Sequence, residues 1–329
     1  MTAAEDPPTE LDPARFATSS TDVRGFRQTF LHEGAGGVPL LLVHGWPETR
    51  RIWWRVVAPL VTAGFEVIAP DLRGFGDSEV GPPGDPFGDV ATHSRDLLAL
   101  VGGHLGHERV VLAGGDLGGP VVQDMALREP DLVERLVLFN SPLPYDKAAM
   151  AGMATRPSRE ASDYFVRQGT DADALATELA TPEQRRRYIA TFYTSRFWAH
   201  PGAFVEVGPG IAGRYGGSGA VDFHTAPFAD AAKLRASFRV YESAVDPAAR
   251  REAPLLARNP LTEALILFGP SDHVLYPDFD RMAAVVFPHH VGPFLLRDCG
   301  HFVPWEAPGP FTSAVRSFCR DLLARDPAR

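Results

Sequence analysis

The stretch Val110–Val122, which reads VVLAGGDLGGPVV, decides the fold of this chain. It joins an apolar run to a helix-like segment through a turn in which one carboxylate, Asp116, lies between two pairs of glycines. A strand that turns this sharply into a helix needs glycines, because neighbouring backbone comes too close for a side chain. The residue at the apex then projects beyond the end of the strand. We therefore predict that Asp116 stands at a sheet edge; the alternative is an ordinary turn in which it only caps the helix.

Apolar runs of strand length alternate with helix-like segments on both sides of this turn. Several of the runs have no polar alternation, which is typical of parallel strands buried on both faces. The sequence therefore predicts an α/β protein with a mostly parallel central sheet flanked by helices. The predicted strands contain Leu40–Val43, Val67–Pro70, Val110–Ala113, Leu136–Phe139, Leu265–Phe268 and Phe294–Leu296. The predicted helices contain Trp53–Val61, His93–Val101, Pro120–Leu127 and Phe311–Leu323.

The alternation stops between residues 141 and 259. This segment has helix-like pieces such as Pro182–Phe192 and a glycine-rich loop, Gly213–Gly219, but no run typical of a buried strand. Because strands resume after it, we expect a helical cap, 141–259, inserted into a core of residues 21–140 and 260–329. A separate C-terminal helical domain is the alternative, which the later strands disfavour. Residues 1–20 are acidic and contain prolines, so we expect a flexible tail there.

The carboxylate at the apex of the turn predicts a particular reaction. A serine hydroxyl attacks carbonyl carbons and needs a base to take its proton, whereas a carboxylate is already ionised at neutral pH. It attacks a saturated carbon, displaces a leaving group and forms an alkyl ester. Epoxides and alkyl halides are substrates of this kind, and esters and amides are not. We therefore expect Asp116 to be a covalent nucleophile.

Two later strand ends supply an acid and a base. Asp272 follows one predicted strand in GPSDHV, and His301 follows the last one in CGHF. Since the carboxyl ends of parallel strands share one edge of a sheet, both side chains are expected beside Asp116. The order nucleophile, acid, base also fits this type of turn. The alternatives to Asp272 are Asp278, Asp280 and Asp298, although Asp298 lies too near His301 in sequence to face it readily.

Six segments together resemble the epoxide hydrolases of the α/β-hydrolase superfamily. They occur in that family's order, and the resemblance extends from about Val23 to Leu323. It implies an α/β-hydrolase fold in which Asp116 is the nucleophile, His301 activates water and Asp272 orients His301. The segments are HGWP (44–47), DLRGFGDSE (71–79), GGDLGG (114–119), FNSP (139–142), GPSDHV (269–274) and CGHF (299–302).

The resemblance also implies which further groups touch the reacting atoms. The backbone N–H groups of Trp46 and Leu117 would form an oxyanion hole, and the peptide bond before the next proline, Pro47, would be cis. Two cap tyrosines, Tyr164 and Tyr241, would donate hydrogen bonds to the epoxide oxygen. Tyr193 and Tyr215 are the reserves for these two positions.

The residue after the nucleophile helps to distinguish an epoxide hydrolase from the related dehalogenases. Haloalkane dehalogenases usually carry a halide-binding Trp where this chain has Leu117, and fluoroacetate dehalogenases usually carry an Arg there. Both differences favour an epoxide hydrolase, which converts an epoxide and water to a vicinal diol. The alternatives are a haloalkane or haloacid dehalogenase with the same nucleophile, and a non-catalytic ligand sensor of the same fold.

The composition of the chain limits which partners it is expected to bind and in which cellular compartment it is expected to act. A net charge of −9 disfavours nucleic acid and anionic membranes as partners, and the longest apolar runs are too short to span a membrane. Two cysteines and an N-terminus without a basic, apolar leader favour the cytoplasm. We expect no metal and no organic cofactor. The expected partner is a small apolar epoxide, and a homodimer is left open. The aromatic residues Phe165, Phe192, Trp198 and Phe204 favour an apolar pocket.

Overall fold

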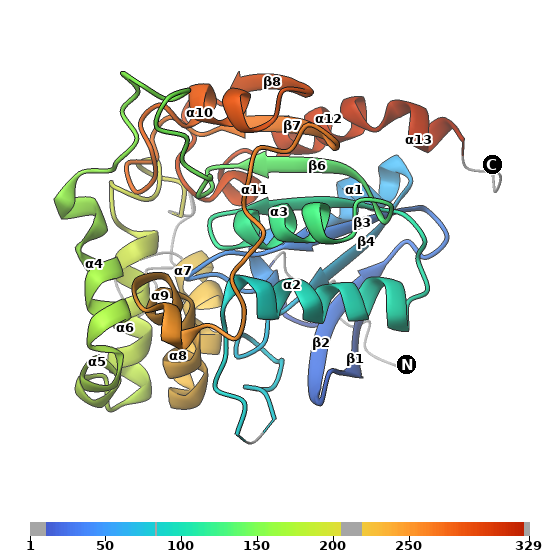
Figure 1. The fold of residues 1–329 in the computed structure, drawn as a ribbon. Helices are drawn as coiled ribbons and strands as arrows, with labels where there is room; N and C mark the ends of the chain where they lie inside the picture. Colours follow the sequence, from blue (N-terminus) through green and yellow to red (C-terminus); the bar gives the residue numbers. More distant parts are fainter. Residues whose placement is uncertain (1–10, 83, 205–218, 326–329) are drawn as a thin grey trace, which may run out of the picture.

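The structure, a computed structural model, describes residues 11–82, 84–204 and 219–325 and is built around one eight-stranded sheet (Figure 1). The strand order is β1-β2-β4-β3-β5-β6-β7-β8, and the strands from β3 onward are parallel. The predicted α/β class and mostly parallel sheet are confirmed. The strands are β1 (Thr18–Val23), β2 (Phe26–Glu33), β3 (Val38–Val43), β4 (Phe65–Pro70), β5 (Val110–Gly115), β6 (Val133–Phe139), β7 (Glu263–Phe268) and β8 (His290–Leu295).

The strands β1 and β2 were not predicted from the sequence. Because of β1, the N-terminal tail ends before residue 20, where the prediction placed its end. β1 begins at Thr18, so residues 18–20 belong to the sheet rather than to a flexible tail over 1–20. β1 pairs antiparallel with β2, and β2 pairs antiparallel with β4. Ser20 Oγ also lies 2.9 Å from Thr29 Oγ1 across the first pair. The tail prediction was wrong at this end because the backbone ladder holds a polar strand that has no apolar run.

Helices cover both faces of the sheet near the predicted places. α2 (Val90–Leu98) packs against α3 (Gly118–Arg128) on one face, and α1 (Val57–Ala63) packs against α12 (Pro308–Phe318) on the other (Figure 1). The predicted helices around 53–61 and 311–323 each divide in two. A short 3-10 turn, η1 (Arg50–Trp53), precedes α1, and α13 (Arg320–Ala324) follows α12. The remaining core helices are α10 (Phe279–Val286) and the single turn α11 (Val303–Glu306).

Residues 141–259 lie between β6 and β7, and we call them the cap segment. Its described residues form six α-helices and two short 3-10 helices, η3 (Ala226–Ala229) and η4 (Pro247–Ala249). They gather beside the carboxyl ends of the strands (Figure 1), and the described residues between β6 and β7 contain no strand. The sheet resumes with β7, so a separate C-terminal helical domain is not formed. Residues 205–218, with most of the glycine-rich loop and Tyr215, lie outside the described residues. The helices are α4 (Arg159–Thr170), α5 (Ala172–Glu178), α6 (Pro182–Tyr193), α7 (Gly219–Thr225), α8 (Ala231–Ser237) and α9 (Arg239–Val245).

The chain returns from the cap through residues 246–259, which we call the strap. In Figure 1 the strap runs across α2 and α3 on its way to β7. Glu252 pairs with Arg95 and Arg128, and the N–H of Leu255 donates to Asp124 Oδ1 at 2.6 Å. Ionic and backbone contacts therefore fasten the strap to the core. Among the described residues, every helix is too short or too polar to cross a lipid bilayer.

Candidate active site

Asp116 stands at the sharp turn between β5 and α3. Its φ of 43° is left-handed, which is uncommon for a residue other than glycine. A Cβ at Gly118 would collide with the Val43 carbonyl oxygen, and one at Gly119 would collide with the Ser141 hydroxyl. Two neighbouring strands therefore impose the glycines that the sequence pattern contains. The turn lifts the Asp116 carboxylate above the carboxyl edge of the sheet.

The two carboxylate oxygens of Asp116 have different neighbours. Oδ1 accepts a hydrogen bond of 2.7 Å from the N–H of Trp46, and Oδ2 lies 3.4 Å from His301 Nε2. A Cβ at Gly45 would collide with Asp116 itself, so a glycine is what lets the Trp46 loop come this close. The Trp46–Pro47 bond is cis, as expected. Leu117 immediately precedes α3, so its N–H lies at a helix N-terminus.

His301 and Asp272 form a buried pair beside this carboxylate. His301 Nδ1 lies 2.8 Å from Asp272 Oδ2, while Asp272 Oδ1 accepts from the N–H of Val274 at 2.7 Å. Burial lowers the pKa of His301, but Asp272 and Asp116 outweigh burial and raise this pKa well above its ordinary value. Of the alternative acids, Asp278 instead binds the N–H of Ala154 and the side chain of Arg281.

Asn140, which the sequence analysis did not single out, connects these groups. It follows β6, and its carbonyl oxygen accepts from the N–H of Asp116 at 2.8 Å. Its side-chain amide donates to Asp272 Oδ2 at 2.9 Å and to the Gly300 carbonyl at 3.2 Å. The FNSP segment indicated only that this position belongs to a familiar motif. Its contacts are with residues far away in sequence, which no local pattern reveals.

The two expected tyrosines lie together over the site. Tyr164 on α4 and Tyr241 on α9 are edge-on to each other, with ring centroids 5.7 Å apart. Burial first, and the charge of Asp116 in addition, raise the pKa of both hydroxyls well above the ordinary value. Both therefore stay protonated and able to donate. The reserve Tyr193 instead donates to the Pro47 carbonyl oxygen at 2.6 Å.

Aromatic rings surround this tyrosine pair. Trp46 stacks on Tyr164 with ring centroids 5.5 Å apart and planes 6° apart. Three of the four expected aromatic residues, Phe165, Phe192 and Trp198, contact one or both tyrosines. The fourth, Phe204, packs in a neighbouring cluster with Tyr193 and Trp305. Apolar rings thus surround the two tyrosines.

Glu48, also missed from the sequence, is buried beside the same carboxylate. Its Oε2 accepts a hydrogen bond of 2.6 Å from the N–H of Gly45. Burial raises the pKa of Glu48 to about 7, with Asp116 adding to the rise while His301 and the Gly45 N–H oppose it. A carboxylic acid that titrates near neutral pH is common at functional sites. The sequence signal that could have identified Glu48 is the HGWP segment, which Glu48 follows directly.

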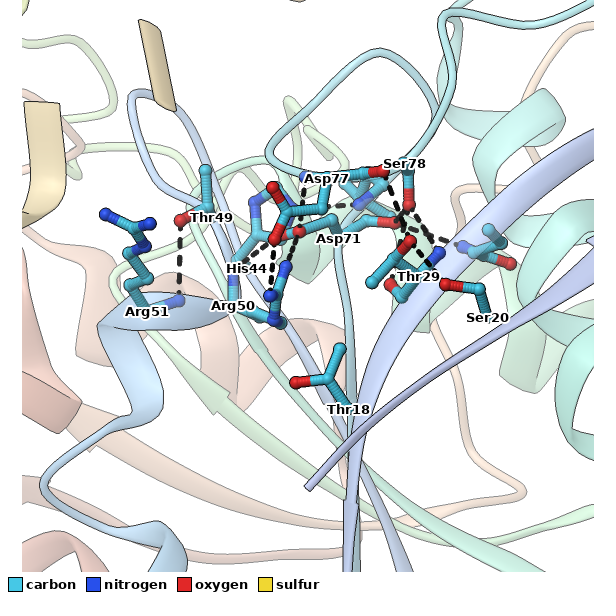
Figure 2. A network of polar contacts seen from close by, with 12 residues as sticks. Thr18, Ser20, Thr29, His44, Thr49, Arg50, Arg51, Asp71, Asp77 and Ser78 are labelled. Carbon is cyan, nitrogen blue, oxygen red and sulfur yellow. Dashed lines mark hydrogen bonds and ion pairs between the residues drawn. The ribbon is translucent and has the colours of Figure 1, made fainter. Parts of the chain in front are cut away.

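A polar network locks the loop that carries Trp46 (Figure 2). Arg50 donates from its backbone N–H to Asp71 Oδ1 at 2.8 Å, and its guanidinium pairs with both Asp71 and Asp77. His44 Nε2 accepts from the N–H of Leu72 at 3.0 Å, so its other nitrogen, Nδ1, donates to the Gly45 carbonyl. The loops after β3 and β4 are therefore joined by the buried side chains of Arg50, Asp71 and His44, with the exposed Asp77 at the edge of the network.

Comparisons with known proteins agree with this geometry. The sequence model of the alpha/beta hydrolase fold family matches residues 38–308. A soluble epoxide hydrolase of Corynebacterium sp. (strain C12) is 42% identical over 120 residues, which are 36% of this chain and 39% of that protein. A fluoroacetate dehalogenase of Burkholderia sp. is 39% identical over 112 residues, 32% of this chain and 35% of that protein. These matches span well under half of the relatives' lengths.

One similar solved structure covers nearly the whole chain. It is the epoxide hydrolase CorEH without ligand, with a TM-score of 0.76 and 26% sequence identity. The match covers 93% of this chain and 99% of that one, so it includes the cap segment as well as the sheet.

Proposed function

Because this chain belongs to the α/β-hydrolase fold family, we propose that it hydrolyses epoxides to vicinal diols through a covalent ester on Asp116. The observation that carries the proposal is a pair of buried tyrosines, Tyr164 and Tyr241, near enough to Asp116 for its charge to raise the pKa of both, with a His–Asp pair beside that carboxylate. Hydroxyl donors opposite a nucleophilic carboxylate suit an epoxide, whose oxygen becomes an alkoxide as the ring opens.

In the first half-reaction the Asp116 carboxylate attacks a ring carbon and the C–O bond of the epoxide breaks. Oδ1 is held by the Trp46 N–H and becomes the ester carbonyl oxygen, so Oδ2, which lies 3.4 Å from His301 Nε2, forms the new C–O bond. The alkoxide that results is stabilised by Tyr164 and Tyr241 and takes a proton from solvent to become a hydroxyl group. Asp116 is now an uncharged ester.

In the second half-reaction His301 removes a proton from water, and the hydroxide attacks the ester carbon. Forming the ester removes the charge of Asp116, which in the free enzyme helps to raise the pKa of His301. His301 therefore becomes a better proton acceptor when one is needed. Oδ1 becomes the oxyanion and is stabilised by the N–H groups of Trp46 and Leu117. The intermediate then collapses, and the departing alkoxide takes the proton from His301 to complete the diol. Asp116 releases the proton of the added hydroxyl to solvent, which balances the proton taken up in the first half-reaction and restores the carboxylate.

The test is to trap the ester in a variant without the base. We would incubate His301→Ala with a panel of epoxides and chloroalkanes and measure the mass of the intact protein. A gain equal to the whole epoxide mass, mapped to the peptide with Asp116, is the expected result. A gain equal to a haloalkane less hydrogen halide would make the protein a dehalogenase. If no compound gave an adduct, the sensor alternative would be favoured and the proposal contradicted.

The expectations on partner and location belong to the same proposal. Its substrate is a small apolar epoxide, in keeping with the aromatic rings around Tyr164 and Tyr241. We place the activity in the cytoplasm, to be checked by cell fractionation. Whether the enzyme forms a homodimer is to be measured by sedimentation.

A further inference from the structure

One short part of the cap segment, Phe197–His200, lies directly against the loops that carry Asp272 and His301. The carbonyl oxygen of Trp198 accepts a hydrogen bond of 2.7 Å from the N–H of His301. The carbonyl oxygen of Phe197 accepts one of 2.8 Å from the N–H of His273, the residue after Asp272. Backbone contacts of this kind make the position of the base depend on how this part of the cap is seated.

Glu306, at the end of α11, binds both sides of that junction. Its Oε2 accepts from the N–H of His200 in the cap segment at 2.9 Å and from the N–H of Gly300 at 2.8 Å. Its Oε1 accepts from the N–H of Phe302 at 2.9 Å. The two core amides flank His301 in sequence. One carboxylate therefore fixes the backbone on either side of the base, together with the adjoining cap residue.

The close approach at this junction is built into the sequence. A Cβ at Gly300 would collide with the Trp198 carbonyl oxygen and with the His200 nitrogen, so a glycine is needed beside the base. The Trp198 ring also lies edge-on to the His301 ring, with centroids 4.6 Å apart. Burial raises the pKa of the Glu306 carboxyl, and the three N–H donors oppose that rise because they stabilise its ionised form.

We propose that Glu306 is a positioning residue for hydrolysis of the ester. It keeps His301 directed at the attacking water and links that orientation to the seating of Phe197–His200. The inference rests on the proposed function, because only the second half-reaction uses His301 as a base. Attack of Asp116 on the epoxide requires no proton transfer to His301. Loss of Glu306 therefore affects formation of the ester much less than its hydrolysis.

The first experiment compares Glu306→Gln with a matched control, Asp278→Asn. The Asp278 carboxylate also holds a cap backbone N–H, that of Ala154 at 2.8 Å, but Asp278 directly precedes α10 and is not part of the His301 loop. Single turnovers with styrene oxide, quenched in acid and followed by protein mass, give the rates of ester formation and loss separately. In E306Q we expect hydrolysis to fall roughly 10- to 100-fold and formation to change by less than about threefold. In D278N the ratio of the two rates stays that of the wild type.

A pH profile separates positioning from a general loss of packing. Burial raises the pKa of Glu306, and its backbone N–H donors and His301 oppose that rise. Since the interaction with His301 is mutual, the Glu306 charge favours protonated His301. In E306Q the acid limb of the hydrolysis rate should therefore move to lower pH, which a packing defect alone would not cause. Glu306→Asp keeps the charge on a shorter side chain. E306D should keep the acid limb of the hydrolysis rate at the wild-type pH, although hydrolysis itself is slower than in the wild type. It also provides the test if E306Q does not fold.

Different results would count against different claims. Equal slowing of ester formation and hydrolysis in E306Q, or wild-type hydrolysis with no accumulation of ester, would overturn the role of Glu306. Absence of any ester in both the wild type and His301→Ala would instead contradict the proposed function, whatever the Glu306 variants do.

Discussion

The hydroxyls of Tyr164 and Tyr241 should contribute to ring opening and not to hydrolysis, since they face the epoxide oxygen only while the ring opens. A donor to a developing oxyanion contributes roughly 10²- to 10³-fold to a rate. We expect Tyr241→Phe and Tyr164→Phe each to slow formation of the ester on Asp116 by about that much. Rapid-quench mass spectrometry measures this step. Tyr188→Phe is the control, because the Tyr188 hydroxyl bonds to Gln168. Unchanged ester formation in Y241F would show the tyrosine assignment to be wrong.

Glu48 should make the folded state less stable as the pH rises. An acid whose pKa is raised on folding, here from 4.5 to about 7, stabilises the fold below its unfolded pKa and loses that contribution between these values. The loss is roughly 3 kcal/mol at pH 8. We therefore expect the unfolding free energy of the wild type to fall relative to Glu48→Gln between pH 4.5 and 8, measured by urea denaturation. The exposed Glu108→Gln is the control, and parallel curves for E48Q and the wild type would refute this account.

At the scale of elements, the strap should open when its ionic contacts are lost. Arg95 and Arg128 lower the pKa of Glu252 to about 2, so the contribution of Glu252 is present above its unfolded pKa of 4.5 and is lost as the pH falls toward 2. The Glu252 side chain is 37% exposed, so solvent screening limits this contribution to about 1 kcal/mol. Glu252→Gln should speed hydrogen exchange in residues 246–259 at low salt. Glu178→Gln, which loses an exposed pair with Arg167, should not. Equal exchange in E252Q and the wild type would mean that apolar packing alone holds the strap.

The sequence predicted the elements that depend on residues close together in the chain, and it missed those that depend on contacts between distant residues. The buried parallel strands were predicted because a continuous apolar run such as Leu265–Phe268 is a local signal. β1 and β2 were missed, since polar residues such as those of TSSTDV join a sheet only through pairing that no local pattern encodes. The same distinction applies to the site. Asp116, Asp272 and His301 were predicted because each follows an apolar run, whereas Asn140 and Glu48 were not predicted. Folding brings Asn140 to Gly269, Asp272 and Gly300, and it buries Glu48 near Asp116 and His301.

At the scale of the whole molecule, the site combines charges from distant segments, and this combination should control its pH dependence. In the free enzyme Asp272 and Asp116 hold the pKa of His301 well above 6.5. Once the ester forms, the Asp116 contribution disappears, so the pKa of His301 falls. We expect the acid limb of ester hydrolysis to lie at lower pH than the titration of His301 in the free enzyme, as followed by NMR. Coincidence of the two values would show that Asp116 does not influence this histidine.

The distance in sequence between Asp116 and His301 also matters while the protein is being made. The two residues are 185 positions apart (301 − 116 = 185), and Asn140 finds its partners Gly269, Asp272 and Gly300 only after most of the chain exists. At the usual pace of translation the ribosome needs roughly 10 to 40 s to add that length. On the proposed mechanism, a nascent chain during this interval carries the group that forms the ester but not the group that removes it. The ester can then be hydrolysed only after the strand β8 and the histidine that follows it have been made.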